Sequence, residues 1–204
     1  MKKHLIVYAK RPLPRHAKTR LGNQIGFEES AGVYARFLYQ CLLELAQLDR
    51  DEISIELSLV ASADTAFFQS AFPEFQISTQ IGGDLGERFT HAFKAAFQNG
   101  AASVVVIGTD IPDLNRAIIQ AAFAALDETE VVIGPAMDGG YYLMGTRQST
   151  ATLFQNIDWS SEVVLAQTEQ LIYTQGLSIH YLPTLLDVDT FADYQRWLAG
   201  RSSR

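Results

Sequence analysis

The chain has 204 residues, 48% of them hydrophobic and 19% charged, and its formal net charge at pH 7 is −7. That composition excludes a disordered chain and argues against a general nucleic-acid binder, which would present a basic face. No apolar stretch reaches the length of a membrane span, and the single cysteine, Cys41, leaves no internal disulfide. We therefore expect one α/β domain over residues 1–204, in the reducing environment of the cytoplasm.

Apolar runs alternate with amphipathic segments along the chain, which predicts a mainly parallel sheet with helices on both faces. The expected strands are 4–9, 53–61, 75–79, 103–108, 130–135, 140–145 and 177–182, and the expected helices are 28–48, 63–72, 86–98, 114–126, 160–174 and 190–198. The strands around Asp138-Gly139-Gly140 are too close for a crossover, so we expect one local antiparallel pair there. A stripe at helical spacing should be core: Tyr34, Phe37, Leu38, Cys41, Leu42 and Leu45.

The segment after the first expected strand concentrates positive charge in an otherwise acidic chain. It holds five of the sixteen Lys and Arg residues, which are Lys10, Arg11, Arg15, Lys18 and Arg20. Lysine offers a point charge and arginine a forked donor, so a cationic loop at the carboxyl end of a strand suits a polyphosphate. A solvated basic loop is the alternative. The segment is not a Walker loop, because the glycine spacing and the Gly-Lys-Ser/Thr end are absent.

Asp110 follows the most β-branched of the expected strands. The run Val104–Ile107 is typical of a strand buried on both faces, and Asp110 comes two residues after the glycine that ends it. Ligands of open parallel sheets bind beyond the carboxyl ends of the strands, so Asp110 is a candidate metal ligand. It could equally be a turn residue. Asp113 is expected to cap the helix that begins at Leu114.

A second acidic group follows the last expected strand. Asp187 and Asp189 alternate in an extended segment, so their side chains should lie on the same side. Two carboxylates on one face repel each other unless a cation joins them. Together with Asp110 they would offer three hard oxygen ligands to Mg²⁺ or Mn²⁺. Alternatively, Asp189-Thr190 caps a helix and Asp193 is a surface residue of its first turn. Zinc is not expected, because the four histidines show no ligand spacing.

Three further segments have both a structural and a functional interpretation. In 82–89, glycines allow close approach of a ligand, or form a turn whose Asp84 or Glu87 favours a helix start. Asp138-Gly139-Gly140 is a hairpin signature, and its glycine pair could also leave room for a substrate. Residues 159–162 predict a helix start, with hydroxyls that could instead hold an acceptor.

Several of these motifs together resemble a known family. They are Ala9-Lys10, Lys18-Thr19-Arg20-Leu21, Gly83-Asp84-Leu85-Gly86-Glu87-Arg88, Ile107-Gly108-Thr109-Asp110-Ile111-Pro112, Gly134-Pro135, Asp138-Gly139-Gly140-Tyr141 and Asp187-Val188-Asp189-Thr190. In this order the set looks like the DUF2064 family of the GT-A, or nucleotide-diphospho-sugar transferase, superfamily. It is also similar to the 2-phospholactate and phosphoenolpyruvate guanylyltransferases. One departure is Arg15, where the family usually has glycine after proline.

The resemblance implies a GT-A-like three-layer α/β/α sandwich, mainly parallel with a local antiparallel hairpin. It implies roles for individual residues, with Lys18, Arg20 and Asp110 catalytic. The nucleotide-binding set would be Lys10, Lys18, Thr19, Arg20 and Gly86. The acceptor-binding set would be Asp138, Gly139, Gly140, Tyr141 and Ser160. The metal, Mg²⁺ or Mn²⁺, would bind Asp110, Asp187 and Asp189.

The expected function is therefore that of a divalent-metal-dependent transferase. Its partners would be a nucleoside triphosphate or a nucleotide sugar and a small-molecule acceptor, without nucleic acid. The cationic loop favours nucleotidyl transfer to a phosphate or carboxylate acceptor, because departing pyrophosphate carries more charge to stabilise. Glycosyl transfer from a nucleotide sugar is the first alternative. A non-catalytic nucleotide-binding module is the second, and Arg15 is the feature that favours it. The sequence does not give the oligomeric state.

Overall fold

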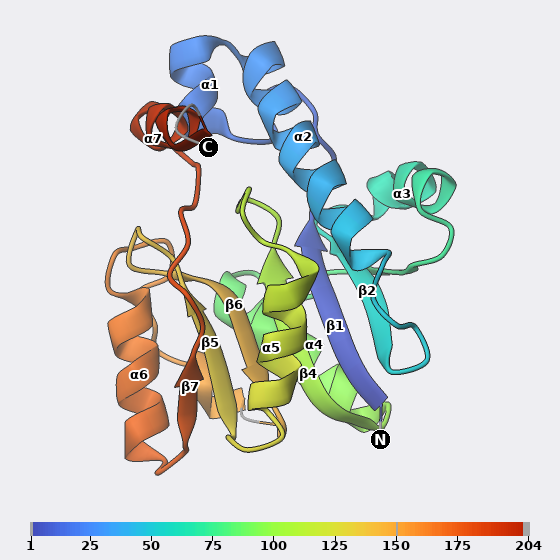
Figure 1. Ribbon diagram of the computed structural model, residues 1–204, viewed down its shortest axis with the longest axis vertical. Coiled ribbons are helices and arrows are strands. Elements are labelled where there is room, and N and C mark those ends of the chain that lie inside the picture. The colour runs from blue at the N-terminus through green and yellow to red at the C-terminus, as the bar shows by residue number, and fades with distance from the viewer. Residues whose placement is uncertain (1, 150, 202–204) are drawn as a thin grey trace.

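The computed structural model describes residues 2–149 and 151–201, and the main feature of this part of the chain is a seven-stranded sheet of order β3-β2-β1-β4-β6-β5-β7 (Figure 1). The strands are β1 (Lys2–Ala9), β2 (Ile53–Leu59), β3 (Gln76–Thr79), β4 (Ala101–Gly108), β5 (Val131–Pro135), β6 (Tyr141–Thr146) and β7 (Ile179–Tyr181). The α-helices are α1 (Thr19–Ile25), α2 (Phe27–Leu45), α3 (Thr65–Ala71), α4 (Leu85–Gln98), α5 (Arg116–Ala125), α6 (Val164–Thr174) and α7 (Phe191–Arg201). Two short 3₁₀ turns, η1 (Ser62–Asp64) and η2 (Ala151–Phe154), complete the elements.

The sheet is parallel except for β6, which confirms the predicted mixed sheet. β6 pairs antiparallel with β5 across the loop at Asp138-Gly139-Gly140, where the sequence predicts the hairpin. It also pairs antiparallel with β4, so that it separates β5 from the other parallel strands. The sequence predicts the hairpin but not this insertion, because pairing between distant strands leaves no signature in a short turn.

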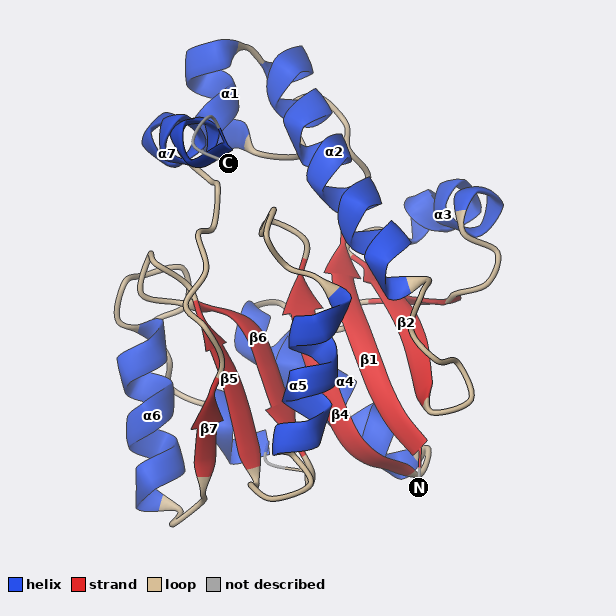
Figure 2. Ribbon diagram, viewed as in Figure 1, coloured by secondary structure: helices blue, strands red, loops and turns tan. Residues whose placement is uncertain are grey.

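Helices cover both faces of the sheet, which confirms the three-layer α/β/α architecture (Figure 2). Alternate residues of β1 divide between the two layers: Leu5 and Val7 pack with α2, α3 and α5, whereas Ile6 packs with α4 and α6. The stripe on α2 that the sequence assigns to the core is buried, Cys41 included, although Phe37 packs in a separate cluster. Strand alternation thus sorts the chain into two cores.

Three local predictions were wrong. Residues 19–25 form the helix α1 rather than part of a loop; Gly22 hides this helix in the sequence, yet a Cβ at that position would lie 2.6 Å from a ring carbon of Phe27 on α2. The cap of α5 is Asn115 rather than Asp113, because the Oδ1 atom of Asn115 accepts from the N–H groups of Ala117 and Ile118 in the first helical turn. Finally, α6 begins at Val164 and not at residue 160.

A small third cluster joins both ends of the chain beyond the carboxyl ends of the strands. α1, α2 and α7 lie together in this lobe, at the top of Figure 1. The buried residues that hold it together are Leu21, Val33, Phe37, Val188 and Trp197. Trp197 packs edge-on against Phe37 at 4.9 Å and stacks with Tyr194 at 5.8 Å between ring centroids. The lobe thereby fixes the segment around Val188 against α1.

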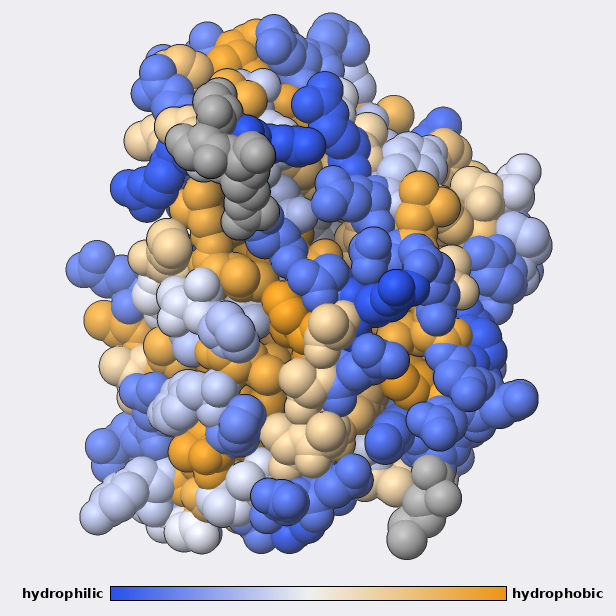
Figure 3. All heavy atoms as spheres, viewed as in Figure 1, coloured by the Kyte–Doolittle hydropathy of each residue, from blue (hydrophilic) through white to orange (hydrophobic). Residues whose placement is uncertain are grey.

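Hydrophilic residues cover much of the face shown in Figure 3, and hydrophobic residues gather across its middle, below the lobe. Within residues 2–149 and 151–201, none of the helices combines the length and the hydropathy needed to cross a membrane.

The lobe gives a prediction about stability. Trp197→Ala should lower the free energy of unfolding by roughly 3–5 kcal/mol, because a nearly buried aromatic side chain is lost from a small cluster. Gln195→Ala, an exposed change in the same helix, should alter it by less than about 0.5 kcal/mol. Chemical denaturation of both variants measures the difference. Equal effects of the two changes would mean that α7 does not hold the lobe.

Candidate functional site

A cavity of about 250 Å³ opens beyond the carboxyl ends of β1 and β4. Its polar lining includes Lys10, Thr109, Asp110, Tyr141 and Asp187, and its apolar floor comes from residues of β4, β6 and α4. Open α/β sheets bind their ligands at this edge. The cavity therefore brings together residues from the first loop, the Asp110 turn, the hairpin and the Asp187 segment, which are far apart in the sequence.

Lys18 is a buried cation placed between two carboxylates. Its side chain is only 1% exposed, and its Nζ atom forms ion pairs with Asp110 and with Asp187, the latter at 3.5 Å. Within the described residues Nζ and the Oδ1 atoms of both carboxylates are buried without a hydrogen-bond partner beyond these ion contacts. The backbone of Lys18 is left-handed, with φ of 49°, just before α1. A non-glycine residue in this conformation is strained, and such strain gathers at functional sites.

Lys18, Asp110 and Asp187, which we call the triad, shift one another's pKa values. Burial by itself would lower the pKa of Lys18, but Asp110 and Asp187 outweigh burial and raise that pKa above its usual value. Burial would raise the pKa of Asp110, but the charges of Lys18 and Lys10 hold it below its usual range. The pKa of Asp187 is raised to about 7 by burial and by neighbouring carboxylates, despite Lys18. The two acids therefore differ, and Asp187 is the one that would gain from a further cation.

The segment 186–189 alternates as the sequence predicts. Val188 is fully buried in the lobe, and its N–H donates to the carbonyl of Asp110 at 3.4 Å. Asp187 meets Lys18, and Asp189 lies 3.1 Å from the Nη1 atom of Arg20. Both carboxylates thus face the basic residues at the start of α1. Thr190 and Asp193 exchange hydrogen bonds at the start of α7, so Asp193 is a capping partner rather than a plain surface residue.

No three His, Cys, Asp or Glu side chains in the described ranges are grouped closely enough to hold a metal ion. Asp110 and Asp187 share the cavity, whereas Asp189 is paired with Arg20 outside it. Two carboxylates are nevertheless a common protein contribution to Mg²⁺, which takes its other oxygens from water and substrate phosphates. The donors present therefore fit a divalent cation bound together with a phosphate ligand.

The cations of the first loop do not all face the cavity. The Arg11 guanidinium lies over the ring of Phe67 at 4.8 Å, and that of Arg15 lies over Phe27 at 4.3 Å. Lys10 lines the cavity, with its Nζ atom 5.5 Å from the ring of Tyr34. Arg15 has φ of 64°, a left-handed conformation that favours glycine. The residue that departs from the family pattern therefore keeps the backbone of a glycine and points onto α2.

A hydrogen-bonded chain supports the cavity from below, and the sequence interpretation missed it. The Tyr34 hydroxyl lies 2.8 Å from Oγ1 of Thr109, which donates to the carbonyl of Tyr8 at 3.2 Å. The Lys10 N–H donates to the Tyr34 hydroxyl at 3.3 Å. The prediction that Tyr34 lies in the core is confirmed. Because a buried tyrosine needs a hydrogen-bond partner for its hydroxyl, the burial of Tyr34 could have indicated such a chain.

The residues of the expected acceptor side have strong structural roles. Gly139 has φ of 89°, and a Cβ there would lie 2.1 Å from the carbonyl oxygen of Glu162. Asp138 accepts from the N–H of Gly140 at 3.0 Å, and Ser160 is exposed with φ of 66°. Of this set only Tyr141 lines the cavity, with its hydroxyl buried.

The glycine-rich segment before α4 is a helix start. Asp84 accepts from the N–H of Glu87 at 2.8 Å, and Glu87 accepts at 2.7 Å from the N–H of Gly83, the residue before the cap, so both acidic side chains cap this helix start. A Cβ on Gly86 would lie 2.6 Å from Nε1 of Trp159, so this glycine is needed for packing. Gly86 and Thr19 do not line the cavity, and their part in nucleotide binding stays a prediction.

A family model and a solved structure match most of this chain between them. The model of a family described as "Uncharacterized protein conserved in bacteria (DUF2064)" matches residues 43–161. A solved structure from Desulfovibrio desulfuricans G20, provisionally named a nucleotide-diphospho-sugar transferase, is 35% identical, with a TM-score of 0.86 over 93% of this chain and 84% of that one. Among the curated proteins no match to this chain is found.

More distant structures share the fold alone. Rv0371c from Mycobacterium tuberculosis H37Rv, in complex with manganese, is 15% identical with a TM-score of 0.57, over 98% of this chain and 99% of that one. The CMP:2-keto-3-deoxy-manno-octonic acid synthetase in complex with CTP is 10% identical with a TM-score of 0.57, over 100% of this chain and 99% of that one.

The triad predicts a pH-dependent stability. Because the folded pKa of Asp187 is raised to about 7, its neutral form stabilises the fold at low pH, and this contribution is lost as the pH rises from about 4 through 7. Asp187→Asn keeps a neutral group, so in a chelator-containing buffer it should unfold at a higher temperature than wild type at pH 8. The gap should shrink towards pH 4.

Asp110→Asn is the matched control, since it faces the same lysine with the opposite shift. The folded pKa of Asp110 is lowered, so its charged form contributes stability at any pH above its unfolded value. This variant should be less stable than wild type at both pH 5 and pH 8. The assignment fails if Asp187→Asn is also destabilising at pH 8.

The hairpin loop gives a third prediction. Gly139→Ala should lower the free energy of unfolding by more than about 2 kcal/mol, because the new Cβ meets backbone and φ is positive. Gly140→Ala should cost less than about 1 kcal/mol, since its Cβ meets only the Asp138 side chain at 3.3 Å. Thermal unfolding of the two variants compares them. A similar cost for both would show that Glu162 can move away.

Proposed function

Since the chain belongs to the DUF2064 family, we propose that it is a divalent-cation-dependent transferase that acts on a nucleotide. The observation that carries the proposal is Lys18, a buried ammonium between two carboxylates beside a cavity at the carboxyl edge of the sheet. A lysine in the protein interior keeps its charge only when it has anionic partners, here Asp110 and Asp187. Once a divalent cation also binds these carboxylates, the three N–H donors of Lys18 suit a phosphate.

The chain's own groups divide the work of nucleotidyl transfer. An oxygen of the acceptor phosphate or carboxylate attacks the α-phosphorus, the bond from that phosphorus to its bridging oxygen breaks, and pyrophosphate leaves. Lys18 and Arg20 stabilise the negative charge that grows on the leaving group, and Lys10 adds a third cation at the cavity. No side chain has to form a covalent intermediate. The protein contributes positioning and fixed charge.

A divalent cation, Mg²⁺ or Mn²⁺, would be held by Asp110 and Asp187, with Asp189 as a further ligand if it leaves Arg20. When bound, it supplies positive charge to the phosphate oxygens and so lowers the repulsion that the attacking group meets. The manganese complex of Rv0371c, which shares the fold, supports this choice. The buried Oδ1 atoms of Asp110 and Asp187, which contact the Lys18 ammonium but accept no other hydrogen bond among the described residues, support it from this chain itself.

A nucleoside triphosphate and a nucleotide sugar are the two candidate donors. The structure with CTP bound has the same fold, which supports a nucleoside triphosphate as donor. The name of the Desulfovibrio desulfuricans protein favours the second candidate, glycosyl transfer from a nucleotide sugar. Tyr141 at the cavity is the acceptor-side residue best placed in both reactions. Arg15 no longer favours a non-catalytic module, because its side chain lies on Phe27 and does not line the cavity.

Ligand-dependent unfolding tests the proposal. Wild-type protein is heated with each of CTP, GTP, ATP, UTP and common nucleotide sugars, with and without Mg²⁺ or Mn²⁺. A ligand at about 100 times its Kd stabilises a protein by roughly 2.7 kcal/mol, so one nucleotide should raise the Tm by several degrees and only with metal. Release of pyrophosphate or of a nucleoside diphosphate then separates the two reactions.

Three variants make this test specific to the site. Arg20→Ala and Asp110→Asn should remove most of the metal-dependent shift and lower turnover by orders of magnitude. Arg20→Ala removes a cation assigned to the leaving group, and Asp110→Asn removes a negatively charged ligand of the divalent cation. Arg11→Ala removes an equal charge from the same loop, but its guanidinium lies on Phe67, so the shift should persist. A metal-dependent shift that survives Asp110→Asn would overturn the site assignment.

A further inference from the structure

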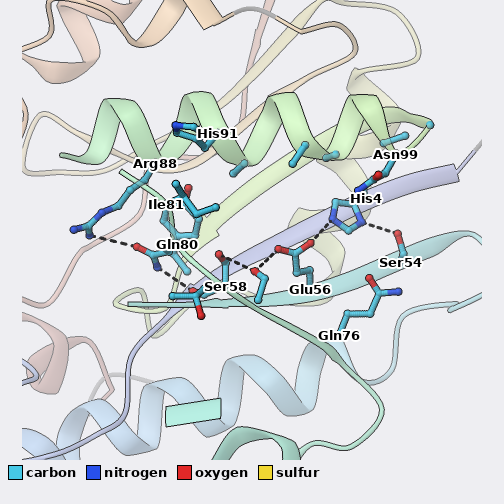
Figure 4. A pocket seen from close by; sticks show the side chains of 18 of the residues that line it. His4, Ser54, Glu56, Ser58, Gln76, Gln80, Ile81, Arg88, His91 and Asn99 are labelled. Carbon is cyan, nitrogen blue, oxygen red and sulfur yellow. Dashed lines mark hydrogen bonds and ion pairs between the residues drawn. The ribbon is translucent and has the colours of Figure 1, made fainter. Parts of the chain in front are cut away.

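A second and larger cavity, of about 490 Å³, lies between α4 and the edge strand β3 with its neighbour β2. It runs along the sheet from Gln80 and Arg88 at the carboxyl edge to His4 and Asn99 at the other end (Figure 4). We call it the edge groove. It shares Tyr8 and Gln80 with the cavity of the proposed transferase site, but otherwise its lining is different.

The groove exists because β2 has a polar face where a helix would normally pack. The strand reads Ile-Ser-Ile-Glu-Leu-Ser-Leu, and its apolar residues enter the core under α2 and α3. Ser54, Glu56 and Ser58 therefore point to the opposite face, towards α4. Helix α4 buries Phe89 and Phe93 against β1 and β4 and turns alanines towards the groove. Small side chains leave the space over β2 and β3 open.

The polar side chains on the floor of the groove form one connected network, which Figure 4 draws. His4 Nδ1 lies 2.7 Å from Oγ of Ser54, and His4 Nε2 lies 3.1 Å from Oε2 of Glu56. Ser78 donates to the other oxygen of Glu56 and lies 3.1 Å from Oγ of Ser58. These bonds join three adjacent strands and hold the donors and acceptors in fixed positions before any ligand arrives.

The network continues to the carboxyl edge of the sheet. Gln80 donates from Nε2 to the carbonyl of Ser58 at 2.9 Å and accepts from Arg88 at 3.3 Å. The Arg88 Nε donates to the carbonyl of Gly82 at 3.2 Å, so the guanidinium is anchored to the turn before α4. Tyr8, between the two cavities, has a buried hydroxyl without a hydrogen-bond partner among the described residues.

The chemistry of the groove selects one class of ligand. Hydroxyl, amide, imidazole and carboxylate groups alternate along it, and charges of both signs are present, from Lys2 and Arg88 to Glu56. This mixture does not suit an apolar molecule, and Glu56 would repel a polyanion. It suits a neutral compound with many hydroxyl groups, each of which both donates and accepts. The volume lies within the range of small-molecule sites, roughly 300–1,000 Å³.

We propose that the edge groove binds a neutral polyhydroxylated compound, a sugar or a polyol. The two Glu56 oxygens, which already contact His4 and Ser78, accept hydrogen bonds from two hydroxyl groups of the ligand. The side-chain amides of Gln76 and Asn99 contact the ligand at the open side of the groove. The side chains of Gln76, His91 and Asn99 have no hydrogen bond within the described part of the chain, so they are available to a ligand. The proposal does not depend on the transferase site, since Gln80 is the one residue of the network that also lines that cavity.

Saturation-transfer NMR and thermal unfolding test this proposal, with glucose, mannose, maltose and myo-inositol as probes. At least one probe should bind wild type and raise its Tm. Glu56→Gln should weaken that probe by about tenfold or more, because it loses a charged acceptor. Glu52→Gln, the same change at an exposed position next to the same strand, should leave binding unchanged. So should Asp110→Asn, at the other cavity.

A second variant guards against a folding defect in Glu56→Gln. Ala95 is an exposed residue of α4 that lines the groove, so Ala95→Leu fills the groove and keeps every polar group. This variant should unfold at the same temperature as wild type and yet no longer bind the probe. Three results overturn the proposal: binding of none of the four probes, binding that survives both variants, or a wild-type dimer in sedimentation that Ala95→Leu dissociates. The last would show that the groove is covered by a second copy of the chain.

Discussion

The ammonium of Lys18 between Asp110 and Asp187 is the interaction on which the site depends. It joins the first loop to the turn after β4 and to the segment before α7, three parts of the chain that share no local contact. Removing two carboxylates from water is costly unless a cation compensates, and Lys18 supplies that charge from inside the fold. The same arrangement leaves Asp187 with a raised pKa of about 7. The site is therefore incompletely neutralised, as a site prepared for a further cation should be.

The lobe of α1, α2 and α7 makes this arrangement possible. Val188 anchors the acidic segment in the lobe, while its neighbours on either side meet Lys18 and Arg20. The strained backbone of Lys18 lies where α1 begins, and Gly22 lets α1 approach α2 closely. Burial of a few large side chains thus offsets local strain at the site.

The sheet carries two cavities in different places. The smaller one lies beyond the strand ends, where Asp110 and Asp187 face it. The larger one lies on the face of β2 and β3 that α4 leaves open, above the network of His4, Glu56 and Ser78. Tyr8 and Gln80 border both, so a ligand in either can contact the wall of the other. The fold therefore has room for two small molecules side by side.

The sequence by itself determined the layers, the order of the strands and of every helix except α1, the hairpin and the position of Asp110 at a strand end, because these follow from local periodicity and chain order. It also located the cationic segment. Only the tertiary structure decided that Lys18 turns inward while Arg11 and Arg15 lie on phenylalanine rings, that β6 separates β4 from β5, and that α4 leaves the polar face of β2 open. These outcomes depend on contacts between residues as far apart as Arg20 and Asp189, whose pairing no local pattern encodes.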